Sequence, residues 1–315
     1  KMKKKAIIIS IKGYKLTKKE KLLIKNENPW GLILFTRNIK SIYQVKNLIK
    51  NIRKITKDKK FPILIDEEGG RVSRLINITK HTSSQKLFGD LFESSPNLAT
   101  SLYKNYIKSL CFLLKEIGIN INTVPVLDVL KKNTHKVIGD RSFSKKALVV
   151  KKLGECCIDN YKKSKVATVA KHIPGHGCAS SDSHFRTPIV KDNYSKLKKE
   201  DFFPFKNLKS HLAMTAHVIY KSLDKSNVAT FSKIIIKNII RNRLRFKGIL
   251  ISDDISMKAL KYDLITSAKK SLAAGCNIVL YCAGNYQDCL KLIKAVPYID
   301  KFTSKKTSEL YKFLG

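Results

Sequence analysis

The chain has 315 residues, of which 43% are hydrophobic and 28% are charged. This is ample apolar material for a buried core, so intrinsic disorder is excluded as the main state. The 63 Lys and Arg residues exceed the 24 Asp and Glu residues and give a formal net charge of +39. A charge of this size is compatible with nucleic acid, anionic membranes or acidic polymers as partners.

The pattern of the cations argues against a nucleic-acid interface. Of the 63 cations, 54 are lysines and nine are arginines, and they are spread along every segment. Arginine is the side chain that best recognises phosphates and bases, and here it is scarce. Lys, Ile and Asn share A/T-rich codons, so genome composition accounts for the charge. We therefore expect no nucleic-acid partner, while attraction to an acidic ligand stays open.

The cysteines and the N-terminal segment indicate a cellular compartment. Seven cysteines, an odd number and widely spaced, do not form a disulfide framework and suit a reducing compartment. The apolar run at residues 6–11 is too short for a signal peptide, and no stretch approaches the roughly 18 apolar residues of a membrane span. We expect a cytoplasmic protein without membrane insertion.

Short apolar segments recur along the chain, and amphipathic segments lie between them. The predicted strands are residues 6–11, 31–35, 61–66, 119–124, 168–173, 213–216, 248–251 and 277–281. Apolar residues three or four apart predict helices at 41–55, 98–117, 145–164, 231–243 and 266–274. Eight strand and helix repeats predict an α/β fold, the (β/α)8 TIM barrel.

The same alternation also suits a doubly wound open sheet. That fold usually has a glycine-rich turn after its first strand, whereas here only Gly13 follows, and no GxGxxG or Walker motif is present. The barrel is therefore favoured, and no nucleotide cofactor is expected. Without a Pro/Gly/Ser-rich linker, residues 1–315 form one predicted domain. Residues 287–315 are expected to add one or two helices that close the barrel.

Polar residues follow several of the predicted strands, where a barrel carries its functional groups. The third strand leads into DEEGGRVSR at 66–74, and the fifth into KHIPGHG at 171–177, followed by DSH at 182–184. The sixth ends near His217, and the seventh leads into SDDISM at 252–257. These segments are the candidate site.

Histidines of the fifth-strand motif raise the question of a metal. His172 and His176 are four residues apart, but Pro174 and Gly175 between them exclude a regular helix, so they do not match a zinc-binding helical pair. A loop site of His172, His176, Asp182 and His184 is conceivable, although the neighbouring Lys171 opposes a cation. We expect no metal.

Two carboxylate-containing motifs have a catalytic interpretation and a plain one. Asp182 can orient His184 for proton exchange near neutral pH, or both can be incidental residues of a surface loop. After the seventh strand, Asp254 suits the cap of a helix at 256–261, whereas Asp253 can face the barrel axis as a nucleophile. Adjacent strand residues point to opposite sides, so the two carboxylates are expected to have different roles.

Together these motifs resemble glycoside hydrolase family 3, in its single-domain β-N-acetylglucosaminidase branch of bacterial peptidoglycan recycling. The resemblance runs over most of the chain, and its longest composite pattern is KHIPGHG with DSH four residues later. The other motifs follow in the family's order: NPWGLILFTRN at 28–38, DEEGGRVSRL at 66–75, GDRSF at 139–143 and ISDDISM at 251–257.

The resemblance implies roles for individual residues. Asp253 matches the nucleophile, and His184 the general acid/base that Asp182 orients. His176 matches a residue with a structural role. The residues that match the sugar-binding set are Asp66, Arg74, Arg141, Lys171 and His172. The departures from the family pattern are Glu67 for Gln, Ile173 for Phe and Thr187 for Leu, and we expect Glu67 to add charge near the sugar.

The implied reaction is retaining hydrolysis through a covalent glycosyl-enzyme, in which a histidine replaces one of the usual two carboxylates. The implied substrate is a muropeptide-derived fragment, GlcNAc-1,6-anhydroMurNAc with or without its peptide, cleaved without metal or organic cofactor by an expected monomer. One alternative is a glycoside phosphorylase or another exo-β-glycosidase of the family. A second is a non-catalytic basic protein that binds peptidoglycan fragments or nucleic acid, against which the intact Asp253, Asp182 and His184 argue.

Overall fold

The computed structural model describes residues 3–80, 83–131, 138–178 and 187–315. Eight parallel strands form a closed barrel in the order β1-β10-β9-β7-β5-β4-β3-β2. Their bounds are β1 (Lys5–Ile9), β2 (Pro29–Leu34), β3 (Ile63–Ile65), β4 (Ile121–Asn122), β5 (Ala167–Ile173), β7 (Leu212–Thr215), β9 (Ile249–Asp254) and β10 (Ile278–Leu280). Each predicted strand coincides with one of them, so the predicted TIM barrel is confirmed.

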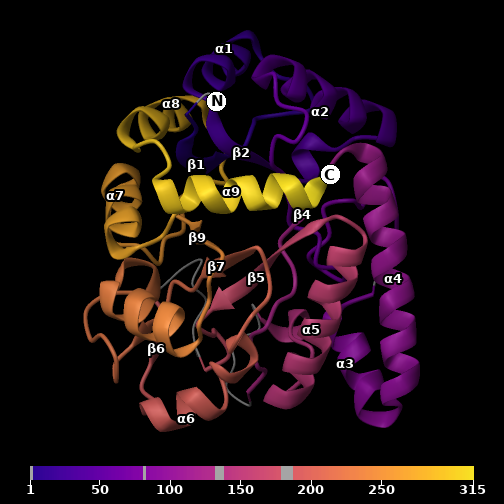
Figure 1. Ribbon diagram of the computed structural model, residues 1–315, viewed down its shortest axis with the longest axis vertical. Helices are drawn as coiled ribbons and strands as arrows, with labels where there is room; N and C mark the ends of the chain where they lie inside the picture. Colours follow the sequence, from indigo (N-terminus) through magenta and orange to yellow (C-terminus); the bar gives the residue numbers. More distant parts are fainter. Residues whose placement is uncertain (1–2, 81–82, 132–137, 179–186) are drawn as a thin grey trace.

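Helices surround the barrel (Figure 1). They are α1 (Lys18–Glu27), α2 (Ile42–Thr56), α3 (Gln85–Ser94), α4 (Pro96–Ile117), α5 (Ala147–Lys163), α6 (Tyr194–Lys199), the π-helical η5 (Ile235–Arg243), α7 (Leu264–Ala274), α8 (Tyr286–Ala295) and α9 (Lys301–Leu314). Short 3₁₀ turns are η1 (Thr36–Asn38), η2 (Gly139–Arg141), η3 (Phe203–Phe205) and η4 (Ala229–Phe231). The five predicted helices are present, the fourth starting four residues later than expected. In the described ranges, no helix is long and apolar enough to cross a bilayer.

The strands are buried on both faces, which explains their continuous apolar sequences. In β1, Ile8 belongs to the cluster inside the barrel, whereas Ile7 and Ile9 pack in the cluster between the strands and the helices. All six residues of β2 and all seven of β5 are buried. Because full burial of one such side chain contributes about 1.5–3 kcal/mol, the two clusters supply most of the driving force for closing the barrel.

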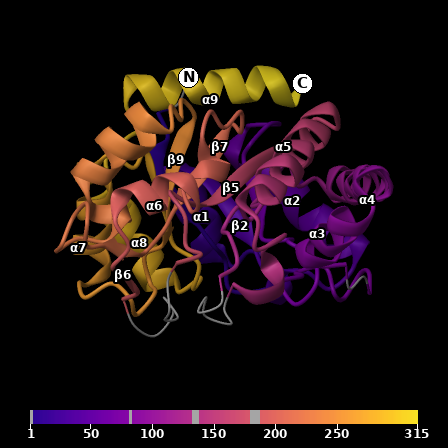
Figure 2. The same ribbon diagram turned by 90° about the horizontal axis from the view of Figure 1, so that it is seen from below.

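The C-terminal helix α9 lies across one end of the barrel (Figure 2). Leu310 of α9 packs in the inner cluster, and the indole N–H of Trp30, near the start of β2, donates to Thr307 Oγ1 at 2.9 Å. This is the end at which the strands begin. The prediction that residues 287–315 add helices that close the barrel is therefore confirmed.

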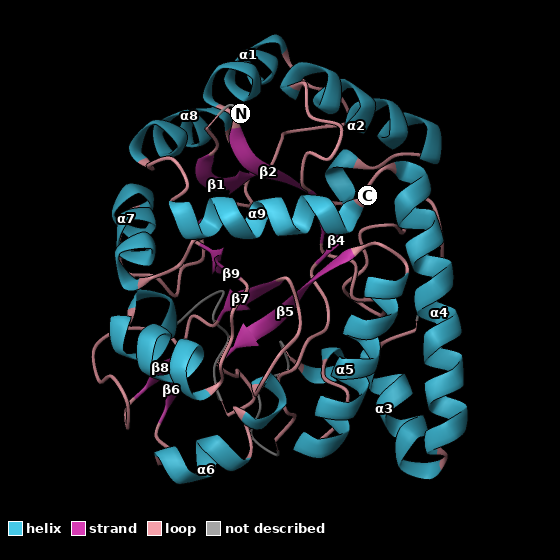
Figure 3. Ribbon diagram, in the orientation of Figure 1, coloured by secondary structure: helices cyan, strands magenta, loops and turns pink. Residues whose placement is uncertain are grey.

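A small second sheet was not predicted. Strand β6 (Ile189–Val190) pairs in parallel with β8 (Ile219–Tyr220), and the two lie beside α6 (Figure 3). Their pairing joins the chain that follows β5 to the chain that follows β7. It therefore links two of the segments that carry polar motifs.

Candidate active site

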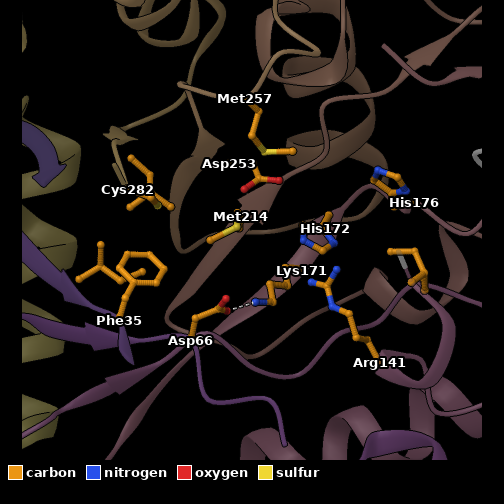
Figure 4. A pocket seen from close by; sticks show the side chains of 13 residues that line it. Phe35, Asp66, Arg141, Lys171, His172, His176, Met214, Asp253, Met257 and Cys282 are labelled. Carbon is orange, nitrogen blue, oxygen red and sulfur yellow. Dashed lines mark hydrogen bonds and ion pairs between the residues drawn. The ribbon is translucent and has the colours of Figure 1, made fainter. Parts of the chain in front are cut away.

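A pocket opens among the carboxyl ends of the strands, at the end of the barrel opposite α9. Figure 4 shows the side chains that line it. They are Ile33, Phe35, Asp66, Ile138, Arg141, Lys171, His172, His176, Met214, Asp253, Met257, Leu280 and Cys282. Five of the predicted site residues, namely Asp66, Arg141, Lys171, His172 and Asp253, are thus brought together.

The polar wall of the pocket is a network of buried and half-buried charges. Lys171 is only 2% exposed, and its ammonium contacts Asp66 and lies 2.5 Å from Glu68 Oε1. Arg141 binds Glu68 through two hydrogen bonds, Nε to Oε2 at 2.7 Å and Nη2 to Oε1 at 3.0 Å. Arg74, the remaining predicted binding residue, donates from Nη2 to Asp66 Oδ2 at 2.8 Å. Arg74 therefore orients Asp66 without lining the pocket itself.

The network keeps its members ionised although they are buried or half-buried. Burial alone would raise the pKa of Asp66, but Lys171 and Arg74 hold that pKa well below its ordinary value. Burial likewise opposes ionised Glu68, whereas Arg141 and Lys171 lower its pKa. Burial by itself lowers the pKa of Lys171, and Asp66 and Glu68 more than offset this effect. The pocket thus presents fixed charge-assisted donors and acceptors, the groups that recognise hydroxyls.

His172 is held in a defined orientation by a residue that the sequence analysis missed. Asp128 is fully buried, and its Oδ2 lies 2.7 Å from His172 Nδ1. Since the carboxylate accepts, Nδ1 carries the proton, which leaves Nε2 for the pocket. Asp128 Oδ1 accepts the backbone N–H groups of His172 at 3.2 Å and His176 at 2.8 Å. The available signal was its place four residues after the end of the fourth predicted strand.

His176 combines a structural and a lining role. Its backbone is fixed by Asp128, and its ring lines the pocket at 5.8 Å from the His172 ring. Burial lowers the pKa of His176 to about 4, so the ring is neutral at physiological pH. The chain leaves β5 at Ile173 without forming a helix, as the Pro174 and Gly175 pair predicted.

Asp253 and Asp254 point to different sides of β9, as predicted. Asp253 lines the pocket, and its Oδ1 accepts the Asp254 N–H at 2.7 Å. Burial tends to raise the pKa of Asp253, but His217, His172, the Asp254 N–H and Lys171 lower it below its ordinary value. Asp253 is therefore a half-buried carboxylate that stays ionised, the state that a nucleophile requires.

Asp254 instead organises the turn after β9. Its Oδ1 accepts from Ser256 N at 3.0 Å and Cys282 N at 3.2 Å, and its Oδ2 accepts from Ser256 Oγ at 2.7 Å. The prediction of a helix at 256–261 is wrong, because these bonds hold a turn there. The next helix, α7, begins at Leu264, where Asp263 caps the N–H groups of Ile265 and Thr266.

His217 anchors the backbone beneath the two aspartates. It is fully buried, and its Nε2 donates to the Asp254 carbonyl at 3.0 Å. Burial lowers the pKa of His217, so the ring is neutral and Nδ1 accepts from the Thr230 hydroxyl at 2.8 Å. The end of β9 is therefore tied to the end of β7, which fixes the direction of Asp253.

Glu67 has a further role that was not expected. It is fully buried, and its Oε2 accepts from Ser73 Oγ at 3.1 Å, Arg74 N at 2.6 Å and Leu75 N at 3.0 Å. Glu67 does not line the pocket, and the expectation that it adds charge near the sugar stays a prediction. Glu67 shapes the loop that presents Arg74.

Two predicted catalytic residues, Asp182 and His184, lie outside the described residues. The metal hypothesis depended on both of them. Within the described part of the chain, no group of three or more His, Cys, Asp or Glu side chains is arranged to hold a metal ion. The described residues of the site are charged hydrogen-bonding groups that face the half-buried carboxylate of Asp253.

The opposite wall of the pocket is apolar and was also missed. Figure 4 shows Phe35 and Cys282 on the far side of Asp253 from Arg141, with Met214 and Met257 close to the carboxylate. Phe35 lies between two guanidinium groups, 4.7 Å from Arg37 Cζ and 5.3 Å from Arg74 Cζ. A pocket with one polar and one apolar wall suits a ligand with hydroxyl edges and an apolar face.

Comparisons with known proteins agree with this geometry. The sequence profile of the Glycosyl hydrolase family 3 N terminal domain matches residues 2–305. A Beta-hexosaminidase of Nitrosomonas eutropha is 34% identical over 281 residues, which cover 88% of this chain and 80% of that protein. A Beta-hexosaminidase of Actinobacillus succinogenes is 35% identical over 306 residues, covering 93% and 87% respectively.

The fold is similar to solved structures as well. NagZ from Neisseria gonorrhoeae, in complex with N-trifluoroacetyl-D-glucosamine, shares 28% identity with a TM-score of 0.88, covering 99% of this chain and 90% of that one. A glycoside hydrolase family 3 beta-N-acetylglucosaminidase from Paenibacillus has 25% identity and a TM-score of 0.88, covering 98% of this chain and 60% of that one. The profile, the relatives and the fold agree: this chain belongs to glycoside hydrolase family 3, and within it to the β-hexosaminidases.

Proposed function

We propose that the protein is a retaining exo-β-N-acetylglucosaminidase that removes non-reducing terminal GlcNAc from peptidoglycan fragments. The proposed substrate is GlcNAc-1,6-anhydroMurNAc with or without its peptide. The observation that carries the proposal is Asp253, a half-buried carboxylate with a lowered pKa that faces the charged wall of the pocket. The names of the curated relatives, Beta-hexosaminidase, support the sugar type.

In the first step Asp253 is the nucleophile. Its Oδ1 is held by the Asp254 N–H, and its Oδ2 accepts no hydrogen bond from the described residues. Oδ2 attacks the anomeric carbon, the bond from that carbon to the leaving oxygen breaks, and a covalent glycosyl-enzyme forms. His184 donates a proton to the departing oxygen, and Asp182 orients its ring.

In the second step a water molecule releases the sugar. His184, now neutral, takes a proton from the water while the water oxygen attacks the anomeric carbon, and Asp253 leaves as a carboxylate. General acid/base assistance of this kind is worth about 10²–10⁴-fold in rate. The chemistry uses side chains of this chain and needs no metal or organic cofactor.

The polar wall supplies the recognition of the sugar. Asp66 offers carboxylate oxygens to hydroxyl donors, while Lys171, Arg141 and the Nε2 of His172 face the same space. These groups are already ordered by their mutual bonds, so they lose little freedom when a sugar binds. NagZ from Neisseria gonorrhoeae binds N-trifluoroacetyl-D-glucosamine, an N-acylated glucosamine, and this supports a 2-acylamino sugar as the ligand here.

The peptidoglycan fragment is proposed from the resemblance of the motifs and from charge. Such fragments carry carboxylates, and a chain with a net charge of +39 attracts them. The monomeric state, the single domain and the cytoplasmic location remain predictions from the sequence. The cytoplasmic location suits this substrate, because recycled fragments are processed inside the cell.

The proposal is tested first with p-nitrophenyl glycosides. We expect cleavage of the β-N-acetylglucosaminide and not of the β-glucoside, with loss of activity in Asp253→Ala and a strong reduction in His184→Ala. A 5-fluoro-glycosyl fluoride should label the wild type, and a peptide map should locate the sugar on Asp253. Failure to cleave either glycoside overturns the proposed function, and a label on another residue overturns the role of Asp253. Repeating the assay in phosphate separates hydrolysis from phosphorolysis, which releases GlcNAc-1-phosphate.

A further inference from the structure

Two buried side chains outside the pocket form hydrogen bonds with the chain that follows β5. The Tyr220 hydroxyl donates to the carbonyl of Gly175. Asp201, between α6 and η3, accepts the Cys178 N–H at 3.2 Å on its Oδ2. Both side chains are completely buried, although neither takes part in the chemistry proposed above.

The glycines of this turn allow a close approach to Asp201. A Cβ on Gly175 would lie 2.7 Å from the Asp201 carbonyl oxygen. A Cβ on Gly177 would lie 2.7 Å from Asp201 Oδ1 and 1.9 Å from the Val129 carbonyl oxygen. The turn is therefore packed directly against Asp201, and a larger residue at either glycine would displace it.

Tyr220 also reaches the chain on the other side of the acid/base motif. It belongs to β8, and its register partner in β6 is Val190. The Ile219 N–H donates to the Pro188 carbonyl and the Lys221 N–H to the Val190 carbonyl, both at 2.9 Å. One side of the motif is thus bonded to the Tyr220 side chain, and the other to the backbone that flanks Tyr220.

The Tyr220 hydroxyl stays protonated and therefore donates at all relevant pH values, and packing fixes the ring. Burial raises the pKa of Tyr220 well above its ordinary value, so the hydroxyl keeps its proton. The ring of Phe202 packs edge-on against it, with the ring centroids 5.5 Å apart. Phe202 directly follows Asp201, so the two anchoring side chains belong to one packed unit.

We propose that Tyr220 and Asp201 are positioning residues for the general acid/base of the reaction. Tyr220 links segment 175–178 to segment 188–190, and Asp201 fixes segment 175–178. The sequence places Asp182 and His184 between these two segments. The inference rests on the proposed function, because it assigns the two residues an effect that acts through His184. The inference predicts that replacing either residue impairs proton transfer and leaves the sugar-binding residues on the other strands intact.

The test compares substrates that differ in their need for the acid. The value of kcat/KM for the bond-breaking step is measured with a dinitrophenyl β-N-acetylglucosaminide, whose leaving group departs without a proton, and with an alkyl β-N-acetylglucosaminide. For Tyr220→Phe we expect about a tenfold loss with the alkyl glycoside and less than about threefold with the dinitrophenyl glycoside. Asp201→Ala should show the same selectivity.

The matched control is Tyr311→Phe. It also removes one tyrosine hydroxyl bonded inside the fold, to Asp58 Oδ2 at 2.6 Å, but at the end of the barrel closed by α9. We expect Tyr311→Phe to leave both kcat/KM values unchanged. This control distinguishes the general effect of losing a tyrosine hydroxyl from the specific effect of losing the bond between Tyr220 and Gly175.

A double-mutant cycle completes the experiment. If Tyr220 acts through His184, Tyr220→Phe causes little further loss in the His184→Ala background. Equal losses on both substrates, or a full additional loss in the double variant, overturn the inference while the proposed function stands. If His184→Ala itself shows no dependence on the leaving group, the acid/base assignment fails, and the positioning role fails with it.

Discussion

The two ends of the barrel differ in the kind of side chain that they bury, which is apolar at one end and charged at the other. At the end closed by α9, Leu310 and Trp30 fill space with apolar surface, and the polar atom of Trp30 is paired once, with Thr307. At the pocket end, Lys171 and Glu68 are ionised and buried, and Asp253 is ionised and half-buried. In barrels of this kind one end serves stability and the other chemistry, and here the division follows the direction of the strands.

The largest difference between the ends is expected from Asp253→Ala. Removing the proposed nucleophile should lower kcat by about 10⁴-fold or more, because no other described side chain occupies its place. The free energy of unfolding should fall only modestly, because the lowered pKa of Asp253 means that its neighbours stabilise the charge in the folded state. Enzyme kinetics and urea denaturation of the same preparation check both statements. A variant that retains a tenth of the activity would contradict the assignment.

Breaking the charge network should affect both stability and function. Glu68→Ala leaves Lys171 and Arg141 without their shared carboxylate, and loss of one partner of a buried pair costs about 3–5 kcal/mol. We expect a lower urea midpoint together with a raised KM. The control is Asp90→Ala, which removes the exposed partner of Lys86 and should cost less than about 1 kcal/mol. Equal effects of the two variants would show that burial of the network has no energetic consequence.

A pH experiment examines Asp201, at the pocket end. Burial, reinforced by Asp128, raises the pKa of Asp201 to about 7 from its ordinary value of 3.8. Between pH 3.8 and about 7 the folded state therefore holds a proton that the unfolded state has lost. The folding stability linked to this proton is fully present below pH 3.8 and is lost as the pH rises through about 7. Asp201→Asn should gain stability relative to the wild type over that range, by at most about 4 kcal/mol. A constant difference between pH 4 and 8 would contradict the raised pKa.

The end closed by α9 should respond in stability alone. Leu310→Ala removes a fully buried side chain from the inner cluster and should cost about 2–3 kcal/mol of unfolding free energy. The kcat/KM of the folded variant should equal that of the wild type. An altered KM would show that the two ends are coupled through the barrel interior.

The sequence predicted best what is local or periodic. The strands were found because most of them are continuous apolar runs, and Asp253 because it follows such a run in a motif. The helix expected at 256–261 failed because Asp254 bonds to Ser256 and to Cys282, 28 residues away. Asp128 was missed because its partners His172 and His176 are more than 40 residues distant along the chain.

Long-range pairing also explains the unpredicted sheet. β6 and β8 have two residues each, too few for a recognisable periodic pattern. Their pairing depends on how β5 and β7 are placed as neighbours in the barrel. Glu67 illustrates the same limit, because its sequence position indicated a charge near the ligand, whereas its partners are the N–H groups of its own loop.

The compensated charges of the pocket have a consequence for how salt acts on the enzyme. Arg74, Arg141 and Lys171 are matched by Asp66, Glu68 and Asp253, whereas the whole chain carries +39. Added electrolyte screens the diffuse field of the surface lysines far more than it screens contacts inside a buried network. Ionic strength should therefore slow the encounter with an acidic fragment and leave the turnover of bound sugar unchanged. A neutral glycoside and an acidic one would then differ in the salt dependence of kcat/KM, and not in that of kcat.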